Sequence, residues 1–230
     1  ALRQAMDLLL DPDNPTHANY RAAIATAFQG LLRSAEFCLK DGKKFNPRLH
    51  LTRFDVKELS SDLAIVMMAP CKNMKQLGGK TSPLVLGGGG LYIDAVAELH
   101  NLMRVDPTPI NREKLTPLFR DPQSNEPIHS LLERARALED VTMMHSIGEN
   151  VEQFGTHSLR IGGATALFAM GADETVIRTM GRWSSDIHRL YVRACFERCK
   201  EWTKKAGSAQ VTDVALIFDD GEGEHEDDDD

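Results

Sequence analysis

The stretch FGTHSLRIGGATALFAMGADETVIRTMGRWSSDIHRLYVRACFERCK, residues 154–200, carries the pattern that decides both fold and site. Apolar residues recur in it at helical spacing, which predicts helices over 158–170, 174–180 and about 185–205. These helices and their ends gather five side chains suited to binding and attacking a phosphodiester: His157, Arg160, Arg182, Trp183 and Tyr191. The stretch therefore predicts a phosphate-handling site within one short segment.

The spacing of these residues has chemical consequences. His157 and Arg160 lie three positions apart, so they share a helix face and can meet one phosphate. A planar guanidinium suits the charge on phosphate oxygens better than an ammonium does. Gly162 and Gly163 each weaken the helix by about 1 kcal/mol relative to Ala, so we expect another backbone or DNA to approach there. A phenol has a pKa of about 10, so Tyr191 needs neighbouring cations to become a nucleophile.

The rest of the chain predicts a mainly α fold with a small antiparallel β-sheet, an α+β class. A helix starts at the signal Asn14-Pro15-Thr16, runs to about Leu32 and bends or restarts near Ser34. Further helices are predicted over 91–103, 128–138 and 143–153, and strands over 49–56, 63–69, 82–86 and, less regularly, 118–119. The second and third strands are joined by a long basic hairpin tip, residues 70–80. Residues 211–218, VTDVALIF, end the fold as a possible strand.

The charge of the chain is unevenly distributed. The formal net charge of the 230 residues is -7, but nine of the 34 acidic side chains lie in the tail 219–230. Residues 1–218 therefore hold 25 acids against 27 Lys and Arg, a net charge of +2. We expect the tail to be disordered, or to mimic DNA and compete for a basic groove. The slightly basic body leaves nucleic acid open as a partner.

Composition indicates a globular protein with a sizeable core, since 42% of the residues are hydrophobic and 27% are charged. No window approaches the roughly 18 apolar residues of a membrane span, so we expect no membrane partner. Four scattered cysteines indicate reduced thiols in an intracellular protein: Cys38, Cys71, Cys195 and Cys199. Because the chain begins at Ala1 without a leader, we expect that it is cut from a longer protein.

The motifs resemble those of the tyrosine recombinases, the phage-integrase family. GLLRSAE, with Arg33 three residues before Glu36, is similar to the first box of the family. HSLRIGGAT is similar to its H-x-x-R box, and GRW to the position filled by His or Trp. RLYVR resembles the nucleophile segment, and the combination is particularly similar to recombinases of Crypton and DIRS-like eukaryotic mobile elements. The resemblance implies a catalytic domain over 14–218, preceded by a linker remnant at 1–13 from a missing core-binding domain.

The resemblance also implies a mechanism that needs neither metal nor ATP. Tyr191 attacks the scissile phosphate to give a 3'-phosphotyrosine and a free 5'-hydroxyl. His157 assists on the tyrosine side, and Lys72 on the hairpin tip protonates the leaving oxygen, although Lys75 or Lys80 could take that place. The implied catalytic set is Arg33, Lys72, His157, Arg160, Trp183 and Tyr191. Trp183 takes packing and one hydrogen bond there, or is a plain hydrophobic plug.

The implied partner is double-stranded DNA, on which relatives assemble as tetramers. Backbone contacts are expected from Lys75, Lys80, Arg182, Arg189 and Arg193, unless these form an ordinary solvated face. Residues 211–218 could pass to a neighbouring subunit or form an edge strand. The protein would lie in the nucleus of a eukaryotic host, or otherwise in the cytoplasm with the DNA.

Two other functions fit the same residues. A type IB topoisomerase shares the chemistry but relaxes supercoils without exchanging strands, so a requirement for a specific paired site separates it from a recombinase. A catalytically silent DNA-binding module is favoured by the acidic tail and the missing domain. The full set of six catalytic residue types in the expected order argues against a catalytically silent module.

Overall fold

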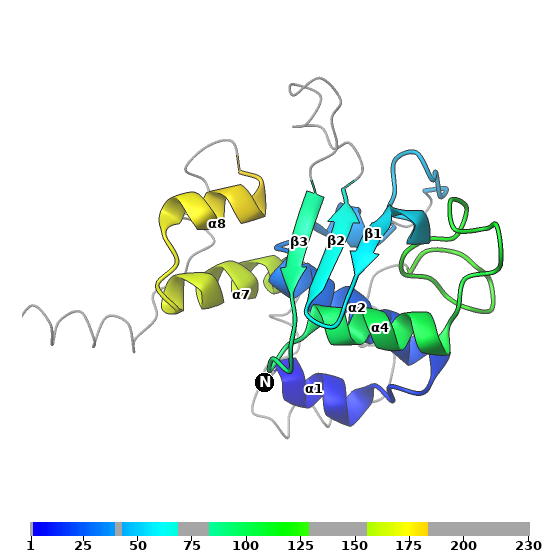
Figure 1. Ribbon diagram of the computed structural model, residues 1–230, viewed down its shortest axis with the longest axis horizontal. Coiled ribbons are helices and arrows are strands. Elements are labelled where there is room, and N and C mark those ends of the chain that lie inside the picture. Colours follow the sequence, from blue (N-terminus) through cyan, green and yellow to red (C-terminus); the bar gives the residue numbers. More distant parts are fainter. Residues whose placement is uncertain (1, 40–42, 69–82, 129–155, 184–230) are drawn as a thin grey trace, which may run out of the picture. The chain divides into compact units, whose positions relative to one another are not determined.

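The computed structural model describes residues 2–39, 43–68, 83–128 and 156–183 (Figure 1). All of these lie in one compact unit, Ala1–Ala194. Within them the fold is helix-rich with a single small antiparallel sheet, so the predicted fold class is confirmed. The helices expected over 128–138 (apart from Ile128), 143–153 and 185–205, the hairpin tip and the strand at 211–218 lie outside the described residues.

Helices α2 (Pro15–Gln29) and α4 (Ala95–Val105) pack together and form the centre of the core. The α2 start signal works as predicted, because the side-chain oxygen of Asn14 accepts hydrogen bonds from the N–H groups of Thr16 and His17. Helix α4 begins four residues later than expected. Asp94 accepts the N–H groups of residues 89–91 and of Ala97, so the glycine turn wraps around its carboxylate and delays the helix.

The sheet has the order β1-β2-β3, formed by Val56–Leu59, Leu63–Met67 and Pro83–Gly87, with both pairs antiparallel. The second and third predicted strands are confirmed, but the first, 49–56, is wrong. Its residues form turns and the 3-10 helix Arg53–Asp55. The cause is local, since the carboxylate of Asp55 accepts both the N–H and the hydroxyl of Thr52 and folds the segment back before β1 starts.

A buried charged cluster fixes the 106–128 segment against α2. The carboxylate of Asp106 accepts hydrogen bonds from Arg53, Arg120 and Asn19, at 2.5–3.0 Å. Burial opposes ionisation of this carboxyl, but the donors outweigh it and hold the pKa of Asp106 below its ordinary 3.8. Burial also lowers the pKa of Arg53, to about 10, which leaves it charged at neutral pH. The expected strand at 118–119 is reduced to isolated bridges on either side of it.

The first residues also form a helix, α1 (Leu2–Leu9), which the sequence pattern did not predict. Met6 is buried in the core, and Arg21 binds the carbonyls of Met6 and Leu10 as well as the carboxylate of Glu98. Helix α1 therefore packs on α2 and α4. The assignment of 1–13 as a linker remnant stays a prediction.

Helices α7 (Thr156–Ala169) and α8 (Glu174–Gly181) carry the described part of the stretch that opened the sequence analysis. Helix α7 packs against α2 and against α8. A Cβ on Gly163 would overlap the carbonyl oxygen of Phe28 in α2, and one on Gly162 would lie 3.3 Å from the Phe28 ring. Gly163 is thus explained by close approach of another backbone, the first of the two predicted causes, whereas Gly162 faces only a side chain.

Candidate functional site

The described residues include five of the predicted site residues: Arg33, His157, Arg160, Arg182 and Trp183. The others lie outside the described residues: Lys72, Lys75, Lys80, Arg189, Tyr191 and Arg193. Arg33 precedes the short helix α3 (Ser34–Phe37), while the remaining four belong to α7 and the end of α8. The predicted motifs meet although up to 152 residues separate the residues that touch.

The site is built around two helix C-termini of the same kind. Helix α2 ends with Gly30 and Leu31, and α8 with Gly181 and Arg182; Leu31 and Arg182 have positive φ values of 50° and 53°. In both, the N–H groups of the left-handed residue and of the residue after it bond back into the last turn, the pattern of a Schellman motif. A left-handed backbone costs roughly 1 kcal/mol or more for a residue other than glycine. Such strain is common near functional sites.

Arg160 joins these two helix ends. Its guanidinium donates to the carbonyl of Leu31 and, at 2.5 Å, to that of Gly181. Carbonyls at a helix C-terminus carry partial negative charge, so both ends favour the cation. The side chain is only 1% exposed. A phosphate that reached Arg160 would therefore have to share or replace these carbonyls.

Trp183 covers Arg160 from the other side. The guanidinium carbon of Arg160 lies 4.0 Å from the centre of the indole ring, a cation–π contact. Trp183 is 9% exposed and packs in a cluster with Leu31, Ala164 and Ile177. A Cβ on Gly181 would overlap the indole, which explains why glycine precedes Arg182. This packing fits both the predicted role of Trp183 in the site and a plain hydrophobic plug, and its hydrogen-bonding role stays a prediction.

Arg33 is the more accessible of the two predicted phosphate clamps, since 31% of its side chain is exposed. Its Nη1 donates to Glu36 at 3.1 Å and its Nη2 to the carbonyl of Arg182 at 3.2 Å. These bonds engage two of the five N–H donors of a guanidinium. Arg33 thus has donor capacity to offer an anion.

Arg182 was predicted as a DNA contact, but only 12% of its side chain is exposed. Its guanidinium donates to Glu36 at 2.8 Å and to the carbonyls of Gly30 and Met180 at 3.3 and 3.0 Å. The sequence pattern identified Glu36 only as a member of the GLLRSAE motif, without a role. The structure shows that Glu36 binds both Arg33 and Arg182.

His157 lies on α7 one turn before Arg160 and is exposed. Loss of some hydration to nearby protein atoms, and then the charge of Arg160, lower the pKa of its imidazole below the ordinary 6.5. The ring is therefore mostly neutral at pH 7. A neutral imidazole accepts a proton, which suits the predicted assistance on the tyrosine side.

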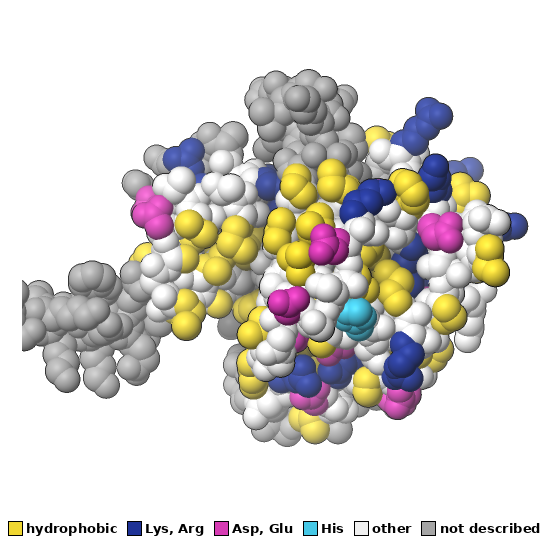
Figure 2. Space-filling model, viewed as in Figure 1, with side chains coloured by type: hydrophobic (Ala, Val, Ile, Leu, Met, Phe, Trp, Pro, Cys, Tyr) yellow, Lys and Arg dark blue, Asp and Glu magenta, His cyan; other side chains and the backbone are white. Residues whose placement is uncertain are grey.

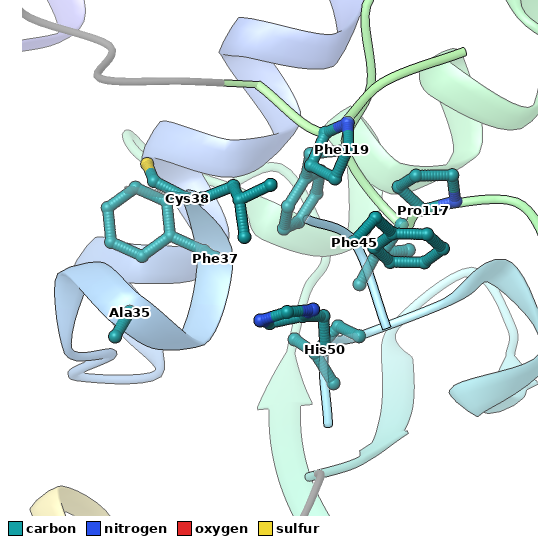
Figure 3. A pocket seen from close by; sticks show the side chains of 11 residues that line it. Ala35, Phe37, Cys38, Phe45, His50, Pro117 and Phe119 are labelled. Carbon is teal, nitrogen blue, oxygen red and sulfur yellow. The ribbon is translucent and has the colours of Figure 1, made fainter. Parts of the chain in front are cut away.

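Two cavities in the described part of the chain lie away from these site residues. One, of about 20 Å³, lies between Phe37 and Cys38 on one side and Phe45, His50 and Pro117 on the other (Figure 3). It has room for about one water molecule, too little for a substrate. Another, of about 320 Å³, is bordered by Arg21, Asp94 and Glu98, whose charged groups are already bound within the fold.

A basic surface not predicted from the sequence lies beside β1. The ammonium groups of Lys57 and Lys114 lie 3.4 and 4.7 Å from the centre of the Phe54 ring, and both lysines are exposed. Phe54 itself is 45% exposed. Figure 2 shows Lys and Arg side chains (dark blue) over this part of the molecule, where β1 and the 106–128 segment lie. No periodicity reveals such a surface, because its residues come from separate segments.

Among the described residues, no three His, Cys, Asp or Glu side chains are placed to hold a metal ion. In the same part of the chain, every helix is too short or too polar to cross a bilayer.

No protein-family model matches the chain, and neither does any curated protein. Solved structures do resemble it. One is the XerH site-specific recombinase bound to palindromic difH substrate in a post-cleavage complex, with a TM-score of 0.58 and 18% identity over 89% of this chain. Another is XerH bound to difH substrate in a pre-cleavage complex, with a TM-score of 0.55 and 16% identity over 90% of this chain.

The fold is that of a tyrosine recombinase catalytic domain. The aligned region covers 50% and 52% of the two XerH chains, so this chain spans about half their length. At this level of identity the likeness establishes the fold, and the function must be argued from the site.

Proposed function

We propose that the protein is a site-specific DNA recombinase that cleaves and rejoins strands through a phosphotyrosine at Tyr191. The observation that carries the proposal is the meeting of the two separate arginine motifs at one place. Arg33 from the first box bonds to Arg182 of the GRW segment, next to Arg160 and Trp183. Chance resemblance of short motifs gives no reason for them to meet in space.

The proposed reaction is a transesterification. The phenolic oxygen of Tyr191 forms a bond to phosphorus, the bond from phosphorus to the 5'-oxygen breaks, and a 3'-phosphotyrosine remains. Neutral His157 takes up the phenolic proton, and Lys72 gives a proton to the departing oxygen. Arg33 stabilises the charge that gathers on the phosphate oxygens. A second 5'-hydroxyl then attacks phosphorus and releases Tyr191, so one phosphoester replaces another at each step.

The XerH structures support this proposal, since XerH is a site-specific recombinase and one of the structures is a post-cleavage complex with its substrate. We extend it to double-stranded DNA as the partner, to a homotetramer on DNA and to integration or excision of a mobile element. We further propose that the protein acts in the compartment of that DNA, the nucleus in a eukaryotic host.

The test is covalent capture on nicked duplex DNA from the ends of the element, in EDTA. The nick lets the short leaving fragment diffuse away, so cleavage is trapped. We expect a protein–DNA adduct that survives denaturation and is lost in Tyr191→Phe. Absence of the adduct in wild-type protein that still binds the same DNA would refute the proposal.

One observation favours a second candidate, a catalytically silent DNA-binding module. Arg160 is buried, and its guanidinium is bonded to two carbonyls. In such a module Arg160 would serve only the fold. The two candidates differ in the adduct, since the silent module binds DNA without ever becoming attached to it.

A further inference from the structure

Three side chains, Arg33, Glu36 and Arg182, close a ring of interactions although Arg182 lies far from the other two in the sequence. Glu36 Oε1 accepts from Arg33 Nη1, and Glu36 Oε2 accepts from Arg182 Nη2. The ring closes through the backbone, because Arg33 Nη2 donates to the carbonyl of Arg182. Arg182 therefore contacts Arg33 twice, once through Glu36 and once through its own carbonyl.

We propose that Arg182 is a positioning residue that orients Arg33 toward the scissile phosphate through Glu36, and that it makes no DNA contact itself. The inference rests on the proposed function for the substrate of Arg33. It goes beyond that function by giving a GRW residue a role in holding the first arginine box.

The surroundings of Arg182 favour this role over a phosphate contact. The two terminal nitrogens of its guanidinium donate hydrogen bonds to four oxygens. These are Glu36 Oε2 at 2.8 Å and the carbonyls of Met180, Gly30 and Leu31 at 3.0, 3.3 and 3.5 Å. Because both terminal nitrogens are bonded and only 12% of the side chain is exposed, Arg182 has few N–H donors to offer an anion in solvent. Arg33, at 31% exposure, is the member of the ring that an incoming phosphate meets.

The backbone of Arg182 points to the same conclusion. Its φ of 53° and ψ of 45° lie in the left-handed region, which glycine adopts without strain. An arginine in this position is strained, and its side chain and carbonyl are both used in the ring. Left-handed geometry is also what lets the α8 end turn the Arg182 carbonyl away from the helix and into the bond with Arg33.

The experiment compares Arg182→Gly, Arg182→Lys, Glu36→Gln and the double variant Arg182→Gly/Glu36→Gln in the full chain. Glycine fits the left-handed backbone, so Arg182→Gly deletes the side chain without adding strain. Lysine keeps the charge but cannot bond to a carboxylate and carbonyls in the same planar geometry. Each variant is measured for the rate of adduct formation at saturating nicked DNA and for the slope of DNA affinity against salt.

A positioning role predicts that Arg182→Gly slows adduct formation about 10- to 100-fold, since small misplacements of a catalytic group have such effects. Arg182→Lys should not restore the rate, and the double variant should be no slower than the slower single variant. The salt slope should stay at the wild-type value. A DNA contact predicts the opposite pattern: a slope reduced in magnitude by about 0.9, restored affinity in Arg182→Lys, and a normal rate once DNA saturates. That pattern, or additive rate losses, would overturn the inference.

A separate measurement keeps the inference testable if the wild-type protein forms no adduct, a result that would refute the proposed function. Wild-type protein, Arg182→Gly, Glu36→Gln and the double variant are unfolded in urea at pH 7. The ring predicts that the shifts in the unfolding midpoint of Arg182→Gly and Glu36→Gln are not additive in the double variant. Additive shifts would show that Arg182 and Glu36 are uncoupled in solution and would overturn the ring itself.

Discussion

The two adjacent glycines of α7 offer a matched test of how the site is held. A Cβ at position 163 would overlap the Phe28 carbonyl oxygen and lie 2.5 Å from Leu31 Cδ2, and the carbonyl cannot rotate away. Gly163→Ala gains about 1 kcal/mol in helix propensity. It loses about 1–3 kcal/mol to overpacking and about 1.5–3 kcal/mol from the Arg160 bond to Leu31, which α7 must loosen as it moves off α2. The expected net loss is roughly 3 kcal/mol.

Gly162→Ala serves as the control, because its Cβ would lie 3.3 Å from an edge carbon of the Phe28 ring, which can shift. Its gain in helix propensity is of the same size, about 1 kcal/mol, and outweighs the small contact cost. Urea unfolding should therefore separate the two variants by roughly 3–4 kcal/mol, and thermal unfolding by about 6–16 °C. If Gly163→Ala is as stable as Gly162→Ala, α7 does not cross α2 as closely as described, and the bond from Arg160 to the Leu31 carbonyl does not depend on that crossing.

Three further predictions concern single side chains. Because the pKa of His157 is lowered, adduct formation should fall on the acid side with a midpoint below pH 6.5, and His157→Gln should lose that limb in a pH–rate profile. Arg160→Ala should lower the free energy of unfolding by roughly 3–5 kcal/mol, because two buried carbonyls lose their donor; a loss under about 1 kcal/mol in urea unfolding would contradict this burial. Asp106→Asn should cost roughly 3–5 kcal/mol at pH 7, because Arg53 and Arg120 stay buried without their counter-charge. Since the pKa of Asp106 is depressed in the folded protein, its contribution to stability is present above pH 3.8 and is lost as the pH falls through the folded-state pKa. The free energies of unfolding of wild type and Asp106→Asn should therefore converge over that range in an acid titration.

The parts of the fold that sequence predicts well are those whose signals are local. The Asn14-Pro15 start of α2 and the apolar alternation of β2 and β3 need only neighbouring residues. Failures arise where a side chain folds the backbone on itself. Asp55 turned a predicted strand into a 3-10 helix, and Asp94 moved the start of α4 to Ala95.

The candidate site divides in the same way. Motif order predicted that Arg33, Arg160 and Trp183 would share a site, and the structure brings them together. It could not predict their partners. These are backbone carbonyls of helix ends whose left-handed residues, Leu31 and Arg182, are not glycines. The glycines before them are used instead for close contacts, Gly30 with Leu84 and Gly181 with the indole of Trp183, and such contacts exist only in three dimensions.

The most direct test of the whole account is to identify the attached residue. The protein is incubated with nicked DNA, the DNA is digested to a short remnant, and the tryptic peptide that carries the nucleotide is sequenced by mass spectrometry. The account predicts the nucleotide on the phenolic oxygen of Tyr191, with Arg33→Gln lowering its yield. A nucleotide on any other residue, or none on protein that binds the DNA, would contradict it.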